Sequence, residues 1–172
     1  MEDYVILVNE HDEELGVREK LQAHLDGALH RAFSIFLFND DGALLLQQRH
    51  PDKYHSGGLW SNTCCSHPRP GEPLEAAARR RLQEEMGVTC DLRRVFGFVY
   101  HSQLGRDLYE HEYDHVFIGR YNGIPVPDQA EVASWRWAET DGLRKDIAER
   151  PEHYTYWFRL VLDRVLQDSR ET

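Results

Sequence analysis

The feature that most constrains the fold is one sharply bounded helix near the middle of the chain. Pro73 suits the start of a helix, because its ring fixes φ and the N–H that it lacks has no partner in the first turn. Gly87 stands where such a helix would end. Between them an apolar residue recurs at every fourth position, at Leu74, Ala78, Leu82 and Met86. This spacing predicts a helix with one apolar stripe.

Segments rich in β-branched and aromatic residues flank this helix on both sides, which is typical of strands. We expect strands over residues 4–9, 32–38, 43–48, 92–101, 113–120 and 134–138. The run Asn39-Asp40-Asp41-Gly42 is a strong turn signal, so the second and third of these strands are predicted to form a hairpin.

Two further helices are expected toward the C-terminus. Thr140 can cap a short helix that ends near Ile147. A last helix over about residues 154–167 is predicted to bury Phe158, Val161, Leu162 and Val165. Residues 18–30 are polar and weakly periodic, which predicts a loop with a helical turn. No internal repeat is present, and residues 1–172 are predicted to form one mixed α/β domain.

The composition narrows the class of protein. A formal net charge of -10 argues against general affinity for nucleic acid, and an anionic substrate would need a local basic patch or a metal. Three cysteines, two of them adjacent, make a poor disulfide framework. The chain shows neither a secretory signal nor an apolar run of about 20 residues. We therefore expect a cytoplasmic monomer with no nucleic-acid or membrane partner.

Reactive side chains recur two residues apart in two places. Because successive side chains on a strand alternate between its faces, Cys65 and His67 are expected to share one face. Glu110 and Glu112 are expected to share another, with His111 turned away. If two such strands lie side by side, a thiol, an imidazole and two carboxylates meet in one pocket. That set of groups can hold a metal and move protons.

The charged face of the central helix carries a second pattern. The segment 71–88, with Glu72, Arg80, Glu84-Glu85 and Gly87, resembles the Nudix box, in which carboxylates present a divalent cation to a substrate diphosphate. The alternative is a solvated face with Arg80–Glu84 and Arg81–Glu85 ion pairs.

This box departs from the Nudix hydrolase pattern at two positions. Arg81 stands where the hydrolases have a glutamate, and Ser66 stands where a glycine usually opens the box. With one metal-binding carboxylate missing, the resemblance implies a site that binds a diphosphate without cleaving it.

A wider resemblance joins these motifs. The segment Trp60 to Pro68, the variant box, Tyr100 and Glu110-His111-Glu112 together resemble type I isopentenyl-diphosphate Δ-isomerase over about residues 20–157. The resemblance implies a Nudix-like α/β fold. It also implies an enzyme of isoprenoid biosynthesis that interconverts isopentenyl and dimethylallyl diphosphate. In this reaction a proton is added at one end of a C=C–C unit and removed from the other, through a carbocation-like species.

The same resemblance assigns roles residue by residue. Proton transfer is assigned to Cys65 and Glu112, with Tyr100 assisting Glu112 and Trp157 facing the carbocation. The ligands of an Mn²⁺, Zn²⁺ or Mg²⁺ ion correspond to His24, His30, His67, Glu110 and Glu112. The groups that bind the diphosphate correspond to Lys20, Arg49, Lys53 and Arg81, with Glu85 helping to hold a diphosphate-bound Mg²⁺.

Several alternatives remain open from the sequence. The chain can be a Nudix hydrolase of a nucleotide or prenyl diphosphate, or a non-catalytic metal-binding or scaffold domain that retains the fold. Trp157 can be a core aromatic, and the residues Lys20, Arg49 and Lys53 can be ordinary surface charges.

The histidines differ in the roles expected of them. His24 and His30 would face different sides of one helix, so a shared metal requires a loop between them. His111 and His115 are predicted to be structural. Cys64, on the face opposite Cys65, is predicted to be a small buried hydrophobe. The remaining histidines have no assigned partner; they are His11, His50, His55, His101 and His153.

Overall fold

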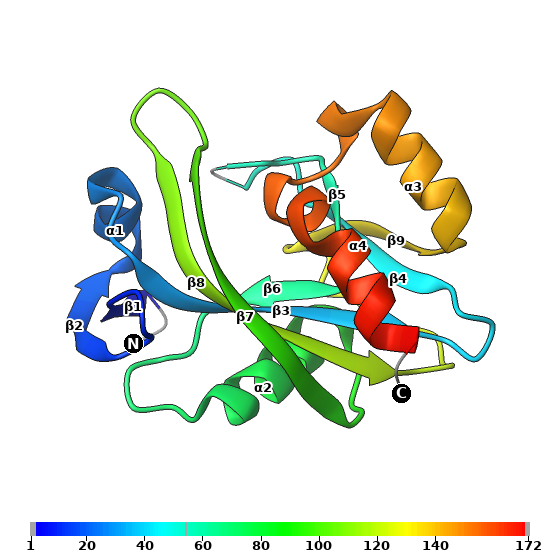
Figure 1. The fold of residues 1–172 in the computed structure, drawn as a ribbon, viewed down its shortest axis with the longest axis horizontal. Helices are drawn as coiled ribbons and strands as arrows, with labels where there is room; N and C mark the ends of the chain where they lie inside the picture. The colour runs from blue at the N-terminus through cyan, green and yellow to red at the C-terminus, as the bar shows by residue number, and fades with distance from the viewer. Residues whose placement is uncertain (1–2, 54, 171–172) are drawn as a thin grey trace.

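A computed structural model describes residues 3–53 and 55–170, and within this part a nine-stranded sheet carries helices on both faces (Figure 1). The strands are β1 (Tyr4–Val8), β2 (Glu14–Glu19), β3 (His30–Phe38), β4 (Leu44–Arg49), β5 (Trp60–Ser61), β6 (Cys64–Ser66), β7 (Leu92–Gln103), β8 (Tyr109–Arg120) and β9 (Val132–Ala138). The helices are α1 (Lys20–Asp26), α2 (Leu74–Met86), α3 (Thr140–Glu149) and α4 (Tyr156–Arg170), with a 3-10 turn over Pro151–His153.

Strand β3 organises the centre of the sheet. It runs parallel to β8 along its whole length, from His30 opposite Glu112 to Phe38 opposite Arg120. On its other side β3 pairs antiparallel with β6, which sets Cys65 opposite Ser34. Strand β7 extends the sheet beyond β8 as a long antiparallel partner. These pairings bring the predicted thiol segment and the predicted carboxylate segment to either side of one strand.

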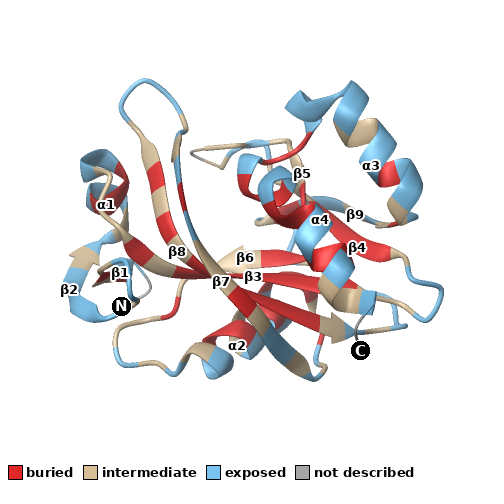
Figure 2. Ribbon diagram, in the orientation of Figure 1, coloured by how far each residue is buried: buried red, intermediate tan, exposed pale blue. Residues whose placement is uncertain are grey.

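The alternation of side chains along β3 divides the core between two layers. Phe33, Ile35 and Leu37 are buried in a cluster with α2, whereas Phe36 is buried in a cluster with α4. Figure 2 shows this burial concentrated in the central strands and on the inner sides of the helices. Cys64 belongs to the α2 layer and Cys65 packs against the α4 layer, as the alternation predicted.

Helix α2 confirms the predicted helix, with its start shifted by one residue. Pro73 is the N-cap in an extended conformation, so Leu74 is the first helical residue. Gly87 caps the C-terminus with φ of +65°, as its position predicted. Ala78, Leu82 and Met86 are buried against the sheet, and Leu74 is partly buried beside them.

The backbone at Val126 packs closely against Gly87 at the end of this helix. A Cβ at Gly87 would lie 2.6 Å from the carbonyl oxygen of Val126, whereas a Cβ at Gly71, where φ is +80°, would meet nothing within 4 Å. Both alanine variants carry the strain of positive φ, but only Gly87→Ala adds a backbone clash. We expect Gly87→Ala to lower the free energy of unfolding by about 1–3 kcal/mol more than Gly71→Ala, measured by urea denaturation. Equal losses in the two variants would contradict this close approach.

Three sequence predictions need correction. The predicted hairpin is confined to its turn, because β3 and β4 pair only at Phe38 and Leu44 and β4 then pairs with β9. The expected loop after residue 18 contains helix α1, whose first turn is capped by the Glu19 side chain. Glu139, and not Thr140, caps α3, since its carboxylate accepts hydrogen bonds from two N–H groups of the first turn.

The remaining predicted elements differ from the structure mainly at their ends, and β5 was not predicted. Strand β6 ends at Ser66, so His67 lies one residue beyond the strand that it was expected to share with Cys65. The last helix begins at Tyr156 and extends to Arg170, and it buries the four apolar residues predicted for it. Strand β8 begins at Tyr109 and therefore contains the whole Glu110-His111-Glu112 motif. Within the described ranges, no helix combines the length and the apolar character needed to cross a bilayer.

Candidate active site and metal centre

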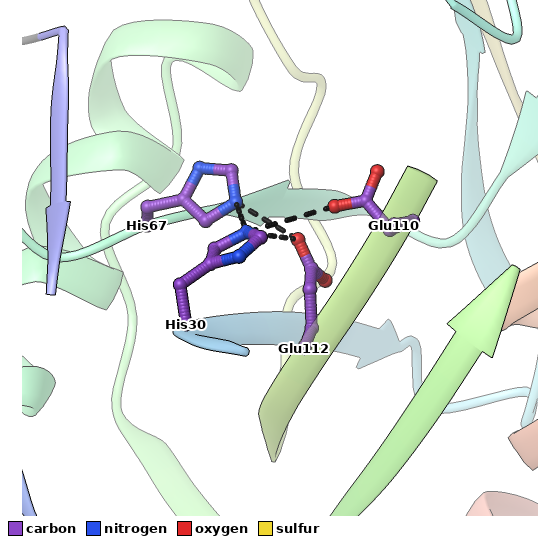
Figure 3. Close-up of side chains that lie close together, drawn as sticks. All are labelled: His30, His67, Glu110 and Glu112. Carbon is purple, nitrogen blue, oxygen red and sulfur yellow. Dashed lines mark hydrogen bonds and ion pairs between the residues drawn. The ribbon is translucent and has the colours of Figure 1, made fainter. Parts of the chain in front are cut away.

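A cluster of imidazole and carboxylate groups lies where β3, β6 and β8 meet (Figure 3). The Nε2 atom of His67 lies 2.8 Å from Oε2 of Glu112, and the Nε2 atom of His30 lies 3.3 Å from the same oxygen. The two Nε2 atoms are 3.3 Å apart, and Nε2 of His30 is 3.8 Å from Oε1 of Glu110. One ligand atom from each of these four residues lies within 4.8 Å of the others.

Strand geometry explains why these residues meet. His30 is the first residue of β3 and stands in register with Glu112 of β8. Glu110 and Glu112 are two residues apart, so both project to the same face. His111 points the other way and contacts the carbonyl oxygen of Gly27 at 3.1 Å through Nδ1.

The backbone orients two of the imidazoles for metal binding. Nδ1 of His30 lies 2.9 Å from the carbonyl oxygen of Ala28, and Nδ1 of His24 lies 2.8 Å from that of Lys20. Because a carbonyl oxygen only accepts, each Nδ1 must donate, which leaves a lone pair on Nε2. Metal-binding histidines commonly show this arrangement. The mixed nitrogen and oxygen donors therefore fit a divalent first-row metal.

His24 approaches the same cluster from a different side. Its Nε2 atom lies 3.2 Å from Oε1 of Glu110, and the Nε2 atom of His55 lies 3.4 Å from Oε2 of that carboxylate. These three residues form a second group of candidate ligands that shares Glu110 with the first. The turn at Gly27 separates His24 on α1 from His30 on β3, and this turn supplies the loop that a shared site required.

His55 was not predicted as a site residue. It lies in the polar loop between β4 and β5, where no regular spacing links it to Glu110. The structure shows its side chain largely buried and directed at that carboxylate.

Burial and mutual contact shift the pKa values of the two glutamates in opposite directions. Burial, together with the neighbouring Glu112 carboxylate, raises the pKa of Glu110 well above its usual value. Burial would also raise the pKa of Glu112, but a hydrogen bond from Glu110 and the close contacts with the His30 and His67 imidazoles hold it well below that value. Burial lowers the pKa of His67 to about 3, so this imidazole is neutral at pH 7, the form that binds metals.

Cys65 lies beside this cluster in a polar recess. Its sulfur is 3.0 Å from Nε1 of Trp157, 3.1 Å from Oδ1 of Asn62 and 3.5 Å from Oγ of Ser34. Burial and the nearby Asp114 carboxylate raise the pKa of the Cys65 thiol to about 12. The group is therefore a protonated thiol at neutral pH, able to donate a proton. Asn62, Ser34 and Asp114 were not predicted as site residues.

Tyr100 and Trp157 both line the pocket that contains Cys65 and Glu112. The Tyr100 hydroxyl donates a 2.6 Å hydrogen bond to Oε1 of Glu112, and burial raises the pKa of this phenol well above its usual value. Trp157 is buried in the α4 core cluster while its ring edge contacts Cys65, so it has a core position and a site position at once. The guanidinium carbon of Arg49 lies 5.4 Å from the Trp157 ring centre.

All four predicted diphosphate-binding cations line the pocket that contains Cys65 and Glu112; they are Lys20, Arg49, Lys53 and Arg81. Glu85 lines the pocket as well, and its Oε2 atom forms an ion pair with Nη2 of Arg81 at 3.0 Å. Glu131, which was not predicted, lies among these cations, 2.5 Å from Nζ of Lys53 and 3.6 Å from the Arg81 guanidinium. The pocket of this acidic chain thus gathers four cations beside four carboxylates, and the cations supply positive charge that an anionic ligand can contact.

The two departures from the hydrolase box contact each other. Nε of Arg81 donates a 3.1 Å hydrogen bond to Oγ of Ser66. The side chain that replaces a metal-binding glutamate is thereby directed into the pocket by the side chain that replaces the glycine. On the outer face of this helix, the predicted pair of Arg80 with Glu84 is present at 3.0 Å.

Comparison with known proteins agrees with this geometry. The NUDIX domain model matches residues 28–158. An isopentenyl-diphosphate Delta-isomerase of Aromatoleum aromaticum is 55% identical over 96% of this chain and 88% of its own length. One of Burkholderia multivorans is 53% identical over 95% of this chain and 93% of its own length.

Solved structures show the same fold at lower identity. The DR0079 protein of Deinococcus radiodurans has a TM-score of 0.74 at 22% identity, covering 96% of this chain and 98% of that one. The Nudix hydrolase RenU of M. smegmatis has a TM-score of 0.59 at 19% identity, covering 96% of this chain and 94% of that one. The predicted α/β Nudix-like fold is confirmed. By its matched domain and its close relatives, this chain belongs to the Nudix superfamily and, within it, to the type I isopentenyl-diphosphate Δ-isomerases.

Proposed function

We propose that this protein interconverts isopentenyl and dimethylallyl diphosphate. The observation that supports this most is the juxtaposition of the Cys65 thiol and the Glu112–Tyr100 pair in a pocket lined by four cations. The two proton-transfer groups come from different strands, β6 and β8, on either side of β3. A substrate bound between them can receive a proton from one group and lose a proton to the other.

The reaction requires balanced proton transfers. One proton is added to the terminal carbon of the double bond, and one is removed from the carbon on the far side of the central tertiary carbon. The double bond moves by one position, and the composition of the substrate does not change. Cys65 and Glu112 exchange the roles of donor and acceptor when the reaction runs in reverse. The face of Trp157 stabilises positive charge on the central carbon, and the buried side chains of Trp157, Tyr100 and Glu112 reduce the access of water that would capture that charge.

The imidazole and carboxylate cluster would hold a metal ion, and the four cations of the pocket would hold the diphosphate. A divalent metal would be held by His30, His67, Glu110 and Glu112, with His24 adjoining through Glu110. When bound, such an ion favours the carboxylate form of Glu112. The diphosphate would be held by Lys20, Arg49, Lys53 and Arg81, with Glu85 contributing to a Mg²⁺ bound to the phosphates.

The direct test follows both possible products. Purified protein is incubated with ¹³C-labelled isopentenyl diphosphate, Mg²⁺ and either Mn²⁺ or Zn²⁺, and the prenyl products are observed by NMR while released phosphate is assayed. We expect dimethylallyl diphosphate and no phosphate release. Phosphate without isomer would support the hydrolase instead, and no turnover with any metal would support a non-catalytic domain.

Removal of divalent metal is expected to abolish turnover. The Glu110 and Glu112 carboxylates lie together in a buried site, where a cation offsets their repulsion and orients them. After treatment with a chelator and gel filtration, we expect activity to fall at least about a hundredfold and to return on adding Mn²⁺ or Zn²⁺ with Mg²⁺. Full activity in metal-free protein would contradict the metal role of this cluster.

Arg81→Gln is expected to weaken substrate binding. Its guanidinium lines the pocket and is held by Ser66 and Glu85, so its loss removes a charged contact to the diphosphate. We expect KM for isopentenyl diphosphate to rise by about tenfold to a hundredfold, measured from initial rates. Arg79→Gln is the matched control, because Arg79 lies on the same helix and is exposed. Equal effects of the two substitutions would argue against a role for Arg81.

A further inference from the structure

Asn62 contacts two residues that line the pocket, Cys65 and Trp157, and its side-chain amide has one fixed orientation. The side chain is fully buried in the short link between β5 and β6. Its Nδ2 group donates 3.0 Å hydrogen bonds to the carbonyl oxygens of Ile35 and Cys64. Because both N–H bonds are used by the backbone, the amide cannot rotate without losing them. Oδ1 therefore faces the opposite direction, toward the side chains of Cys65 and Trp157.

That oxygen contacts two of the groups proposed to act on the substrate, Cys65 and Trp157. Oδ1 of Asn62 accepts from the Cys65 thiol at 3.1 Å and from Nε1 of Trp157 at 3.2 Å. Nε1 of Trp157 also reaches the Cys65 sulfur at 3.0 Å. An indole N–H can only donate, so the three groups form a closed triangle in which each contact has a defined direction.

A third donor, the Ser61 hydroxyl, keeps Oδ1 of Asn62 hydrogen-bonded when the Cys65 thiol loses its proton. The Ser61 hydroxyl donates to Oδ1 at 2.9 Å. If the thiol hydrogen leaves for the substrate, Oδ1 retains the Ser61 and Trp157 donors, and the sulfur retains the Trp157 N–H. Ser34 is a weaker neighbour, since its hydroxyl donates to Asp114 at 2.7 Å and lies 3.5 Å from the sulfur.

We propose that Asn62 is a positioning residue that holds the Cys65 sulfur and the Trp157 indole in fixed relation to each other and to the substrate. This inference rests on the proposed isomerase function. Its physical basis is that proton transfer to carbon depends steeply on alignment, and a displacement of about 1 Å can cost about a hundredfold in rate. Asn62 itself does not touch the reacting carbons, so its loss should slow the chemical step without weakening diphosphate binding.

The test compares Asn62→Ala with Thr63→Val. Thr63 is an equally buried neighbour whose hydroxyl donates to the carbonyl oxygen of Leu45 at 2.7 Å and accepts from the N–H of Leu37 at 3.0 Å, in the α2 layer. Both substitutions remove buried hydrogen bonds to the backbone, but only Asn62→Ala removes a contact to Cys65. Initial rates, the folded fraction by circular dichroism, and the solvent deuterium isotope effect on kcat are measured for each.

We expect Asn62→Ala to lower kcat per folded molecule by about 10- to 100-fold with KM changed less than about twofold, and to raise the solvent isotope effect as proton transfer becomes slower. Thr63→Val should keep the wild-type kcat and isotope effect per folded molecule. A purely structural role would reduce the folded fraction in both variants and leave the isotope effect unchanged, and that result overturns the proposal.

A variant that does not fold and a wild-type protein without isomerase activity would have different consequences for the proposal. If Asn62→Ala does not fold, Asn62→Ser is used, because serine lacks the amide oxygen that contacts the Cys65 sulfur but keeps a polar group at the buried position. Wild-type kcat and isotope effect in that variant overturn the proposal. Lack of isomerisation by the wild-type protein would instead overturn the proposed function itself, so the two failures are distinguishable.

Discussion

Replacing Cys65 with alanine is expected to lower kcat for isomerisation by at least about a thousandfold. Its thiol is protonated at neutral pH because burial raises its pKa to about 12, and it faces the pocket shared with Glu112. Alanine removes the only thiol that lines this pocket among the described residues. The measurement is the initial rate of dimethylallyl diphosphate formation at saturating substrate.

Cys90→Ala is the control for this substitution. Cys90 is also a free, partly buried thiol, but it packs in the α2 layer and is absent from the pocket. We expect wild-type kcat in Cys90→Ala and an unchanged folded fraction in both variants. A Cys65→Ala protein that keeps more than about a tenth of wild-type kcat would remove the thiol from the proposed proton transfer.

Glu112→Gln is expected to disable the proton transfer and the metal centre together. Glutamine matches glutamate in shape and still offers Oε1 to the Tyr100 hydroxyl, so the fold should be retained. Its amide, however, cannot take up a proton and brings no negative charge beside His30 and His67. We expect kcat to fall by at least about a thousandfold, and metal affinity to fall by about tenfold to a hundredfold.

The measurements are metal content after dialysis and initial rates with excess metal. His111→Gln provides a control on the adjacent residue, because His111 points to the opposite face of β8 and contacts the backbone at Gly27. Its metal content and kcat should equal those of the wild type. If Glu112→Gln kept full metal content and full activity, Glu112 would have neither proposed role.

Much of the local architecture followed from spacing along the chain. The four-residue repeat and the flanking Pro73 and Gly87 predicted α2 within one residue, because helix geometry and capping act over short distances. Strand alternation correctly separated Cys64 from Cys65, and His111 from Glu112. The hairpin after Phe38 failed as a prediction because a turn signal specifies a reversal of the chain, not which strand β4 then pairs with.

Spacing along the chain predicted that Cys65 and Glu112 could meet in one pocket, and both line it. Tyr100 and the four basic residues, which the family resemblance implied, line the same pocket. His55 and Asn62 were missed as site residues. The first lies in an irregular loop, and the second depends on an amide orientation that only its backbone partners determine.

By itself, the sequence determined the face on which each reactive side chain lies and the limits of the central helix, because backbone geometry sets both within a few residues. The tertiary structure alone decided which of these faces meet. The parallel pairing of β3 with β8 sets His30 opposite Glu112, and the pairing of β3 with β6 brings Cys65 to the same surface. Such pairings depend on the packing of both layers of the core, and no local spacing specifies them.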